Sequence, residues 1–293
     1  TKTFHAFNHS NPGSNDPEHW RKAEEVTLLD EYSSPLEIED INGNHRAVKK
    51  GYNEELVIAE ALDARYTEFY FCGAEDPNVF SGYFGGEVNG SAYAYKSEVY
   101  AHTGQRSLRM AAGDVLPLAR EVTFGTSGAE DMAEQTYVAS VWVHQENKDN
   151  VSLYYKLSNG GGSGPQAWQS ITSNSIKAGD WYLLTLEVPL ANPAFNPYNI
   201  VEVGLEISSS CGSCYVYCDD FRLQPQGSTM TAYVYEPETR RRVAMLNNDN
   251  FGTKYVYDPL GRLIRESREQ ADQPSLLGGF KKVQENTYHN HTQ

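Results

Sequence analysis

Short strands are the elements that the pattern of apolar and polar positions predicts for most of the chain. Residues 201–207 alternate without exception, with apolar side chains at the odd positions, so one face of this strand must be buried. Other short runs rich in β-branched and aromatic residues lie at 46–52, 137–143, 151–157, 181–188 and 215–218. Turn sequences such as Asn42-Gly43 and Asn89-Gly90 separate the runs. Many short, regularly punctuated strands predict an all-β sandwich or barrel.

Helical periodicity is confined to residues 54–65. There Leu56, Ile58, Ala59 and Leu62 keep part of the 3.6-residue spacing. We expect a short helix or an irregular turn in this segment, which leaves the all-β assignment unchanged.

A β-hairpin repeat occupies the C-terminal part of the chain. The sequence Tyr233-Val-Tyr-Glu-Pro237 recurs as Tyr255-Val-Tyr-Asp-Pro259, and each copy is followed by another strand-like run. Proline after an acidic residue starts a tight turn, and Gly261 can supply a positive φ within it. Each unit therefore predicts a strand, a turn and a return strand, with the tyrosine rings stacked across neighbouring strands.

The second unit, Tyr255-Val-Tyr-Asp-Pro-Leu-Gly-Arg-Leu263, resembles the YD repeat of the Rhs family, in which Tyr-Asp followed by Gly-Arg-Leu marks each hairpin. The first unit departs from that pattern, because Arg240-Arg-Arg242 replaces Gly-Arg-Leu. A third, looser unit lies upstream at residues 37–48, where an Asn-Gly turn joins two strand-like runs. The resemblance implies a segment of a large secreted or cell-surface Rhs protein.

The middle of the chain resembles another group, the galactose-binding-like jelly rolls that include many carbohydrate-binding modules. The matching stretches, in the order found in such modules, are residues 101–109, 137–142, 179–182 and 218–223. Together the two resemblances imply a jelly-roll β-sandwich flanked by YD-repeat β-hairpins. We expect three segments, at 1–76, 77–226 and 227–293, with the sandwich inserted in the repeat array and its two ends close together.

The charge balance excludes two classes of partner. The chain carries 24 basic and 39 acidic side chains, with a formal net charge of −15 at pH 7. Such a chain repels the phosphate backbone of nucleic acids and an anionic membrane surface. No apolar run approaches the roughly 20 residues that a membrane-spanning helix needs. We therefore expect neither nucleic-acid binding nor membrane insertion.

Four cysteines make disulfides the leading expectation for a secreted protein, and they allow three pairings. Cys211-Gly-Ser-Cys214 is typical of a hairpin tip closed on itself. Cys218 could then meet Cys72 if the first and last strands of the sandwich are neighbours. The alternative is a zinc knuckle, which we disfavour because only three thiols cluster and no histidine lies near them.

Structural calcium is the sharpest chemical hypothesis, and it comes from the jelly-roll resemblance. Such modules often hold Ca²⁺ between an acidic residue before the first strand, carbonyl groups of the His-Thr-Gly loop and an aspartate of the closing strand. On this chain the resemblance points to Glu75 or Asp76, to the segment from Thr103 to Arg106, and to Asp219 or Asp220. Oxygen ligands of this kind suit calcium. The alternative is that Asp219 and Asp220 only cap a strand end.

Sugar binding requires exposed aromatic platforms beside polar groups. Trp142 and Trp181 match core positions of the jelly-roll pattern, so we expect both to be packing residues. Trp168, beside the glycine-rich stretch 160–164, is the better candidate for a sugar contact, with Tyr154 and Tyr155 on the preceding strand.

Catalysis finds little support in the sequence. Glu37-Ile-Glu-Asp-Ile-Asn42 approaches the alternating carboxylates of retaining glucanases, but the last glutamate is missing. Some Rhs shells end in a self-cleaving Asp-Pro-x-Gly-Leu site, whereas this chain has Asp258-Pro-Leu-Gly-Arg262, so we interpret Asp258 as a turn residue. We expect no enzymatic activity.

Two functions from different classes remain. In the first, the chain is an architectural segment whose partners are other segments of the parent Rhs protein or a surface or secretion complex. In the second, the sandwich binds a glycan and the hairpins display it. No basic and apolar leader opens the chain, so we expect the sequence to be a mature or excised fragment. The resemblance implies a bacterial protein at the cell surface or outside the cell, of the kind exported by type IX secretion.

Overall fold

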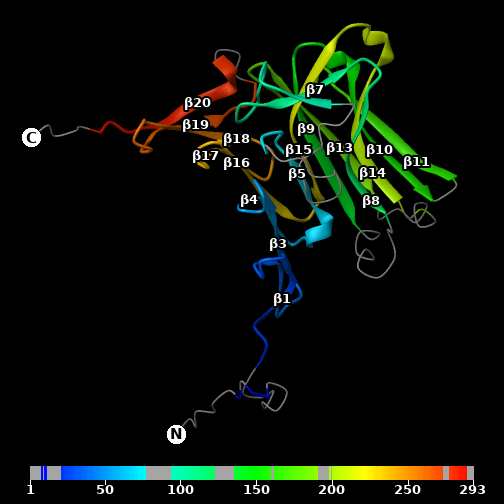
Figure 1. Ribbon diagram of the computed structural model, residues 1–293. Coiled ribbons are helices and arrows are strands. Elements are labelled where there is room, and N and C mark those ends of the chain that lie inside the picture. Colours follow the sequence, from blue (N-terminus) through cyan, green and yellow to red (C-terminus); the bar gives the residue numbers. More distant parts are fainter. Residues whose placement is uncertain are drawn as a thin grey trace, which may run out of the picture.

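The computed structural model describes residues 8, 10–11, 21–76, 94–122, 135–159, 162–190, 198, 200–272 and 277–288. The fold is all-β, as predicted, with a jelly-roll β-sandwich beside a long sheet of hairpins (Figure 1). Within these residues the helical elements are short 3-10 turns, at Tyr66–Glu68, Lys148–Asn150, Ser209–Cys211 and Leu277–Gly279. A membrane-spanning helix was not found among them.

The sandwich consists of two antiparallel sheets. The four-stranded sheet has the order β11 (Gly162–Ser170), β10 (Val151–Asn159), β14 (Ile200–Ile207) and β8 (Val115–Val122). The other sheet runs β12 (Lys177–Ala178), β13 (Trp181–Pro189), β9 (Thr136–His144), β15 (Tyr215–Pro225), β7 (Ser107–Ala111) and β6 (Ala94–Ser97), with β5 (Tyr70–Cys72) also paired to β15. We call this second sheet the seven-stranded sheet.

The core of the sandwich lies between these two sheets. Alternate residues of each strand fill it, such as Leu153, Tyr155 and Leu157 of β10, and Val201 and Val203 of β14. The alternation predicted for residues 201–207 is therefore confirmed. Side chains of the intervening positions point to the outer face of each sheet, because successive residues of a strand face opposite sides.

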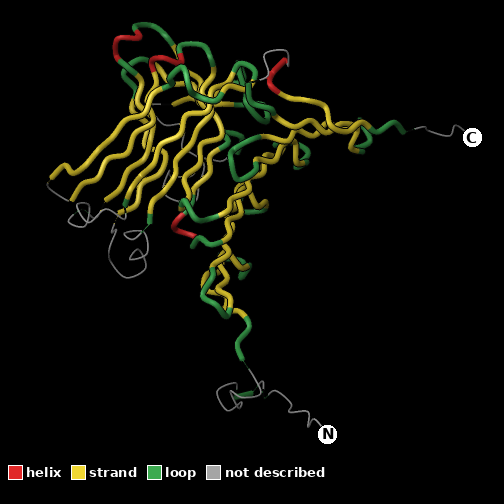
Figure 2. Tube along the Cα trace, turned by 180° about the vertical axis from the view of Figure 1, so that it is seen from behind, coloured by secondary structure: helices red, strands yellow, loops and turns green. Residues whose placement is uncertain are grey.

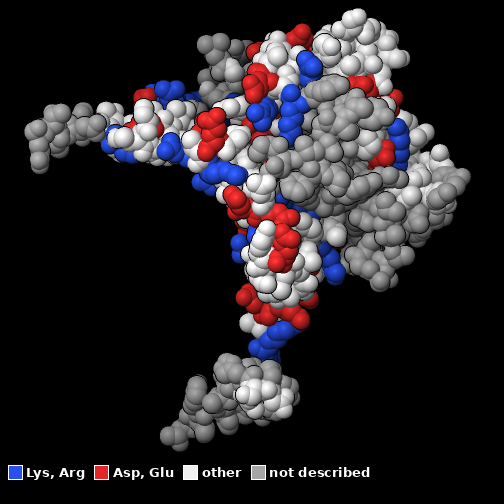
Figure 3. Space-filling view, viewed as in Figure 1, with Lys and Arg blue, Asp and Glu red and all other residues white. Residues whose placement is uncertain are grey.

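The third sheet joins hairpins from the two ends of the chain. Its order is β1 (Glu24–Leu29), β2 (Pro35–Asp40), β3 (His45–Gly51), β4 (Leu56–Leu62), β16 (Thr229–Tyr235), β17 (Arg242–Leu246), β18 (Gly252–Tyr257), β19 (Leu263–Glu269) and β20 (Phe280–Glu285). Figure 2 shows this hairpin sheet from behind as a bent ribbon whose two arms run away from the sandwich. Lys and Arg side chains lie beside Asp and Glu along it (Figure 3).

The sandwich is inserted between two adjacent strands of the hairpin sheet. Strand β4 pairs with β16, with Leu62 opposite Thr229 and Ala59 opposite Ala232. The two ends of the sandwich segment therefore lie close together, as predicted. The chain passes into the seven-stranded sheet already at β5, although residues up to 76 were expected to belong to the first hairpin segment.

Residues 54–65 do not form the expected helix or irregular turn. Leu56–Leu62 is strand β4, which pairs with β3 on one side and β16 on the other. Its small residues Ala59 and Ala61 are fully buried in a cluster that also holds Met230 and Leu246. Pairing on both sides of the strand outweighs the weak helical spacing of its apolar residues.

The predicted hairpins after Tyr233 are present, but their tyrosines do not meet as expected. Strand β17 separates β16 from β18, and its Arg242 guanidinium lies 5.6 Å from the Tyr233 ring centroid and 5.2 Å from that of Tyr255. The rings therefore contact a shared cation. Asp258 is a turn residue, as predicted, since its Oδ1 accepts hydrogen bonds from the N–H groups of Leu260 and Arg262.

Strand β16, at which the chain returns from the sandwich to the hairpin sheet, provides a test of the buried cluster that contains Met230. Met230 is fully buried there, whereas its neighbour Thr229 is exposed. We expect Met230→Ala to lower the free energy of unfolding by about 2–5 kcal/mol, because it leaves a cavity at the junction. Thr229→Ala should change it by less than about 0.5 kcal/mol. Urea denaturation of both variants measures the difference, and equal losses would show that the junction has no tightly packed core.

Candidate functional site

Part of the outer face of the seven-stranded sheet is covered by the hairpin sheet. Trp142 and Trp181 lie on this face in a buried cluster, as predicted for packing residues. Phe251, from the turn between β17 and β18, meets the Trp142 ring edge-on at 5.5 Å between centroids. The indole N–H of Trp142 donates to the carbonyl oxygen of Asn250 at 2.7 Å. One turn of the hairpin sheet thus closes over the sandwich.

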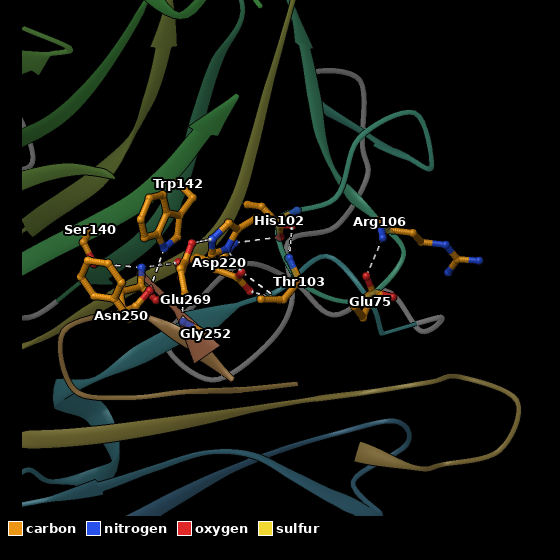
Figure 4. A network of polar contacts seen from close by, with 12 residues as sticks. Glu75, His102, Thr103, Arg106, Ser140, Trp142, Asp220, Asn250, Gly252 and Glu269 are labelled. Carbon is orange, nitrogen blue, oxygen red and sulfur yellow. Dashed lines mark hydrogen bonds and ion pairs between the residues drawn. The ribbon is translucent and has the colours of Figure 1, made fainter. Parts of the chain in front are cut away.

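His102 is the polar centre of this contact (Figure 4). Its Nδ1 lies 2.7 Å from Asp220 of β15, and its Nε2 lies 2.6 Å from Glu269 at the end of β19. The imidazole stacks on Trp142 with 4.4 Å between centroids. Burial disfavours the charged ring, but Glu269 and Asp220 raise the pKa of His102 above its ordinary value. A buried histidine with a carboxylate at each ring nitrogen therefore bridges the sandwich and the hairpin sheet.

A β-bulge on β15 brings two aspartates into this region. Asp219 is opposite Trp142 of β9 and Arg222 is opposite Ser140, so β15 has one extra residue between the two pairs. Asp219 Oδ2 accepts from the backbone N–H of His102 at 2.8 Å, and its Oδ1 accepts from that of Asp220 at 2.8 Å. Both aspartates are fully buried. Burial raises the pKa of Asp219 well above its usual value, with Asp220 and Glu75 adding to the shift.

The two acidic residues before the first strand that were predicted as calcium ligands contact different parts of the molecule. Glu75 reaches the predicted loop, where its Oε1 accepts from the N–H groups of Gln105 at 2.6 Å and Arg106 at 2.5 Å. Gly104, with φ of 62°, leaves room for this carboxylate, since a Cβ there would lie 2.3 Å from Glu75 Oε1. Asp76 instead accepts from the N–H of Tyr52, in the hairpin sheet.

Several of the predicted calcium ligands are thus close together but already bonded to protein donors. Thr103 donates its hydroxyl to Asp220, with both carboxylate oxygens at 2.8 Å. The residues with described positions include no group of three or more His, Cys, Asp or Glu side chains arranged to hold a metal ion. Calcium binding at these residues stays a prediction.

The cysteines bear out one pairing and not the other. Cys211 and Cys214 form a disulfide at the tip before β15, as predicted. Cys72 and Cys218 are both buried, and they are not disulfide-bonded to each other. Cys72 is opposite Phe221 on the neighbouring strand, so Cys218 lies three residues away along β15. That offset is too long for a disulfide.

Two of the three residues predicted for sugar binding, Trp168 and Tyr154, lie on the outer face of the four-stranded sheet. Trp168 of β11 is 44% exposed and lies opposite Tyr154 of β10. Tyr154 is covered, and its hydroxyl donates to Glu202 at 2.8 Å. Tyr155 was wrongly assigned to the platform. It follows Tyr154 on the strand, so it faces the opposite side and packs in the sandwich core.

Two features of the site were not predicted from the sequence. Glu269 is the second carboxylate of the His102 bridge, although it lies far away in the hairpin repeat. Arg222 and Gln224, which follow the bulge, line a cavity on the covered face of the seven-stranded sheet. In the sequence, only the alternation at the end of β15 hinted that Arg222 and Gln224 share one face of the strand. It does not show which face the hairpins cover.

No protein-family model matches this sequence, and no curated protein matches it. Solved structures similar to this chain include the CBM22-2 xylan-binding domain from Paenibacillus barcinonensis Xyn10C, with 13% identity and a TM-score of 0.36 over 54% of this chain and 99% of that one. The C-terminal family 22 carbohydrate-binding module of Clostridium thermocellum Xyn10B has 16% identity and a TM-score of 0.34 over 56% and 98%. A family 30 module of the C. thermocellum cellulase Cel9D-Cel44B has 13% identity and a TM-score of 0.31 over 47% and 84%.

The His102 bridge predicts a stability that depends on pH. Because the pKa of His102 is raised in the folded state, the bridge stabilises fully below about pH 6.5, its unfolded value. That contribution is lost as the pH rises through the folded pKa. We expect the melting temperature to fall as the pH rises above about 6.5 and through the folded-state pKa, and His102→Gln to remove this dependence.

The matched control is His144→Gln, because burial lowers the pKa of His144. A histidine whose pKa is lowered by folding stabilises the protein at high pH and loses this contribution as the pH falls. The His144→Gln variant should therefore keep the loss of stability that the native protein shows as the pH rises. Thermal unfolding between pH 5 and 9 compares the three proteins. An NMR titration of His102 in the native protein serves where His102→Gln does not fold, and an unshifted pKa would contradict the bridge.

The calcium prediction has its own test. Calcium added to the chelated protein should release heat and raise the melting temperature, whereas magnesium should do less because it accepts irregular oxygen sites poorly. Titration calorimetry and thermal unfolding measure both. If calcium produces neither heat nor a thermal shift, the prediction of a calcium site at these residues is wrong.

Proposed function

We propose that the chain is a non-catalytic glycan-binding module, which binds sugar on the outer face of the four-stranded sheet. The observation that carries the proposal is Trp168, a large aromatic side chain that is exposed on a regular strand. An exposed indole face is a stacking surface for the C–H groups of a pyranose ring. A strand holds such a group in place better than a loop does.

Neighbouring charged groups fix the Trp168 ring in position. Its Nε1 donates to Glu206 Oε2 at 3.0 Å, and the Nζ atom of Lys156 lies 5.6 Å from the ring centroid. Lys156 and Glu206 are themselves 3.6 Å apart. The platform is therefore ordered before a ligand arrives, which reduces the entropy lost on binding. The same two side chains can exchange hydrogen bonds with sugar hydroxyl groups.

A second carboxylate is held beside this platform by a buried tyrosine. The Tyr154 hydroxyl donates to Glu202, and burial together with that carboxylate raises the pKa of Tyr154. The phenol therefore stays a neutral donor. Gly204 provides the space for it, because a Cβ at that position would lie 2.9 Å from the Tyr154 hydroxyl oxygen and 2.3 Å from a backbone carbonyl oxygen of Leu116. Glu202 and Glu206 then share one strand face with Trp168 across β10.

We further propose that the hairpins belong to an Rhs-type YD array of a secreted or cell-surface bacterial protein, exported by a type IX route. The pairing of β4 with β16 supports this proposal, since the array continues across the inserted sandwich. Strands β1 and β20 are the outer strands of the described hairpin sheet and could pair with other segments of the parent protein or with a surface complex. A purely architectural role is the second candidate, favoured by this continuity.

A variant without the Trp168 side chain distinguishes glycan binding from a purely architectural role. A glycan array is expected to yield a ligand for the native chain, and Trp168→Ala should weaken its binding by about 2 kcal/mol, or roughly 30-fold. Calorimetry measures the change in affinity. Tyr32→Ala is the matched control, because Tyr32 is 69% exposed but lies in the hairpin sheet. A blank array, or equal losses in the two variants, would leave the architectural role.

A further inference from the structure

A cavity of about 430 Å³ lies on the covered face of the seven-stranded sheet. Its floor includes Arg222, Ser140 and Thr185, which are opposite one another on the neighbouring strands β15, β9 and β13. Its other wall is the β17–β18 turn with Asn248 and Phe251. The volume falls in the range of small-molecule sites, about 300–1,000 Å³.

Arg222 is held rigidly in this floor. Its side chain is 2% exposed, and its Nη1 donates to the carbonyl oxygens of Asn247 at 2.7 Å and Asn248 at 3.1 Å. Its Nε and Nη2 have no hydrogen-bond partner within the described part of the chain. Buried polar groups are almost always paired, so two empty donors on one buried guanidinium call for an occupant.

The positive charge of Arg222 is also left without a direct counter-ion among the described residues. Burial lowers its pKa to about 10, while Asp220 and Asp249 act in the opposite direction, so the guanidinium stays charged at neutral pH. Asp220 is already bonded to His102 and Thr103. Asp249 is exposed at the rim of the cavity.

The empty donors have the geometry of a carboxylate receptor. Nε and Nη2 point from the same edge of the planar guanidinium and match the two oxygens of a carboxylate. Gln224, one position further along the same face, has an Oε1 atom without a donor among the described residues, while its Nε2 donates to Asn248 at 3.0 Å. A hydroxyl group beside the carboxylate would satisfy that oxygen. Phe251 offers an apolar wall for the rest of the molecule.

We propose that this cavity binds a hydroxylated carboxylate of the size of one hexuronic acid. Its carboxylate pairs with Arg222, and one of its hydroxyl groups donates to Gln224. This site is separate from Trp168, which lies on the outer face of the other sheet of the sandwich. It therefore does not depend on the glycan-binding function proposed for that face.

Titration calorimetry with galacturonate, galactose and acetate tests the ligand class. Galacturonate should bind at least about tenfold more tightly than either of the others, because only it supplies both the charged and the hydroxyl contacts. Equal binding of galactose would overturn the role of Arg222, and equal binding of acetate would overturn the role of the hydroxyl groups. A complete absence of heat with galacturonate would show that the cavity holds water only.

Thr185→Glu tests the site without disturbing the buried arginine. Thr185 is exposed and lines the same cavity in the same row as Arg222, so a carboxylate at this position adds negative charge to the cavity and repels an anionic ligand. We expect affinity for galacturonate to fall by about tenfold or more. Thr185→Gln is the matched control, with the same length and no charge, and should bind nearly as well as the native chain. Equal losses in both variants would contradict the proposal, whereas Trp168→Ala should leave this binding unchanged.

Discussion

The His102 bridge is the interaction on which the relation between the sandwich and the hairpin sheet depends. One carboxylate comes from the closing strand of the sandwich and the other from the end of β19, and all three groups are buried. A buried charge is tolerated only when it is paired. Removal of one of the three groups leaves the other two buried without their full set of partners. Glu269 is fixed in turn, since its second oxygen accepts from the N–H of Gly252 at 2.8 Å. The bridge thus positions the turn that covers Trp142 and encloses the cavity at Arg222.

Local patterns predicted the strands and turns well, and failed where long-range contacts decide the outcome. The alternation of residues 201–207 and the Asp258 turn could be predicted because both follow from neighbouring residues. The strand at 56–62 could not, since one of its two partners, β16, comes from a distant part of the chain. The expected Cys72–Cys218 disulfide failed because Cys72 is opposite Phe221, three residues beyond Cys218 on β15, and this register could not be read from local patterns.

The candidate sites could likewise be predicted where neighbouring residues decide the outcome, and not where long-range contacts do. Trp168 could be identified because its exposure follows from a polar strand next to a turn, whereas choosing between Tyr154 and Tyr155 required the strand's facing direction. Glu269 carried no local signal at all, because its contact is with a histidine from a loop of the sandwich. A buried ionic bridge between distant segments is invisible to periodicity, which records only which side of one element is apolar.

The two sites proposed on the sandwich differ in how far the hairpin sheet covers them. The outer face of the seven-stranded sheet is closed by the hairpin turn, so a binding site there admits only a molecule that fits the cavity at Arg222. The outer face of the four-stranded sheet carries the exposed Trp168 and lies on the side of the sandwich opposite the hairpin turn, so the proposed platform is not enclosed in the same way. Because β4 and β16 fix both ends of the inserted segment and His102 fixes its orientation, the platform points away from the array. An insertion anchored in this way leaves the outer face of the four-stranded sheet uncovered while the hairpin sheet itself remains continuous.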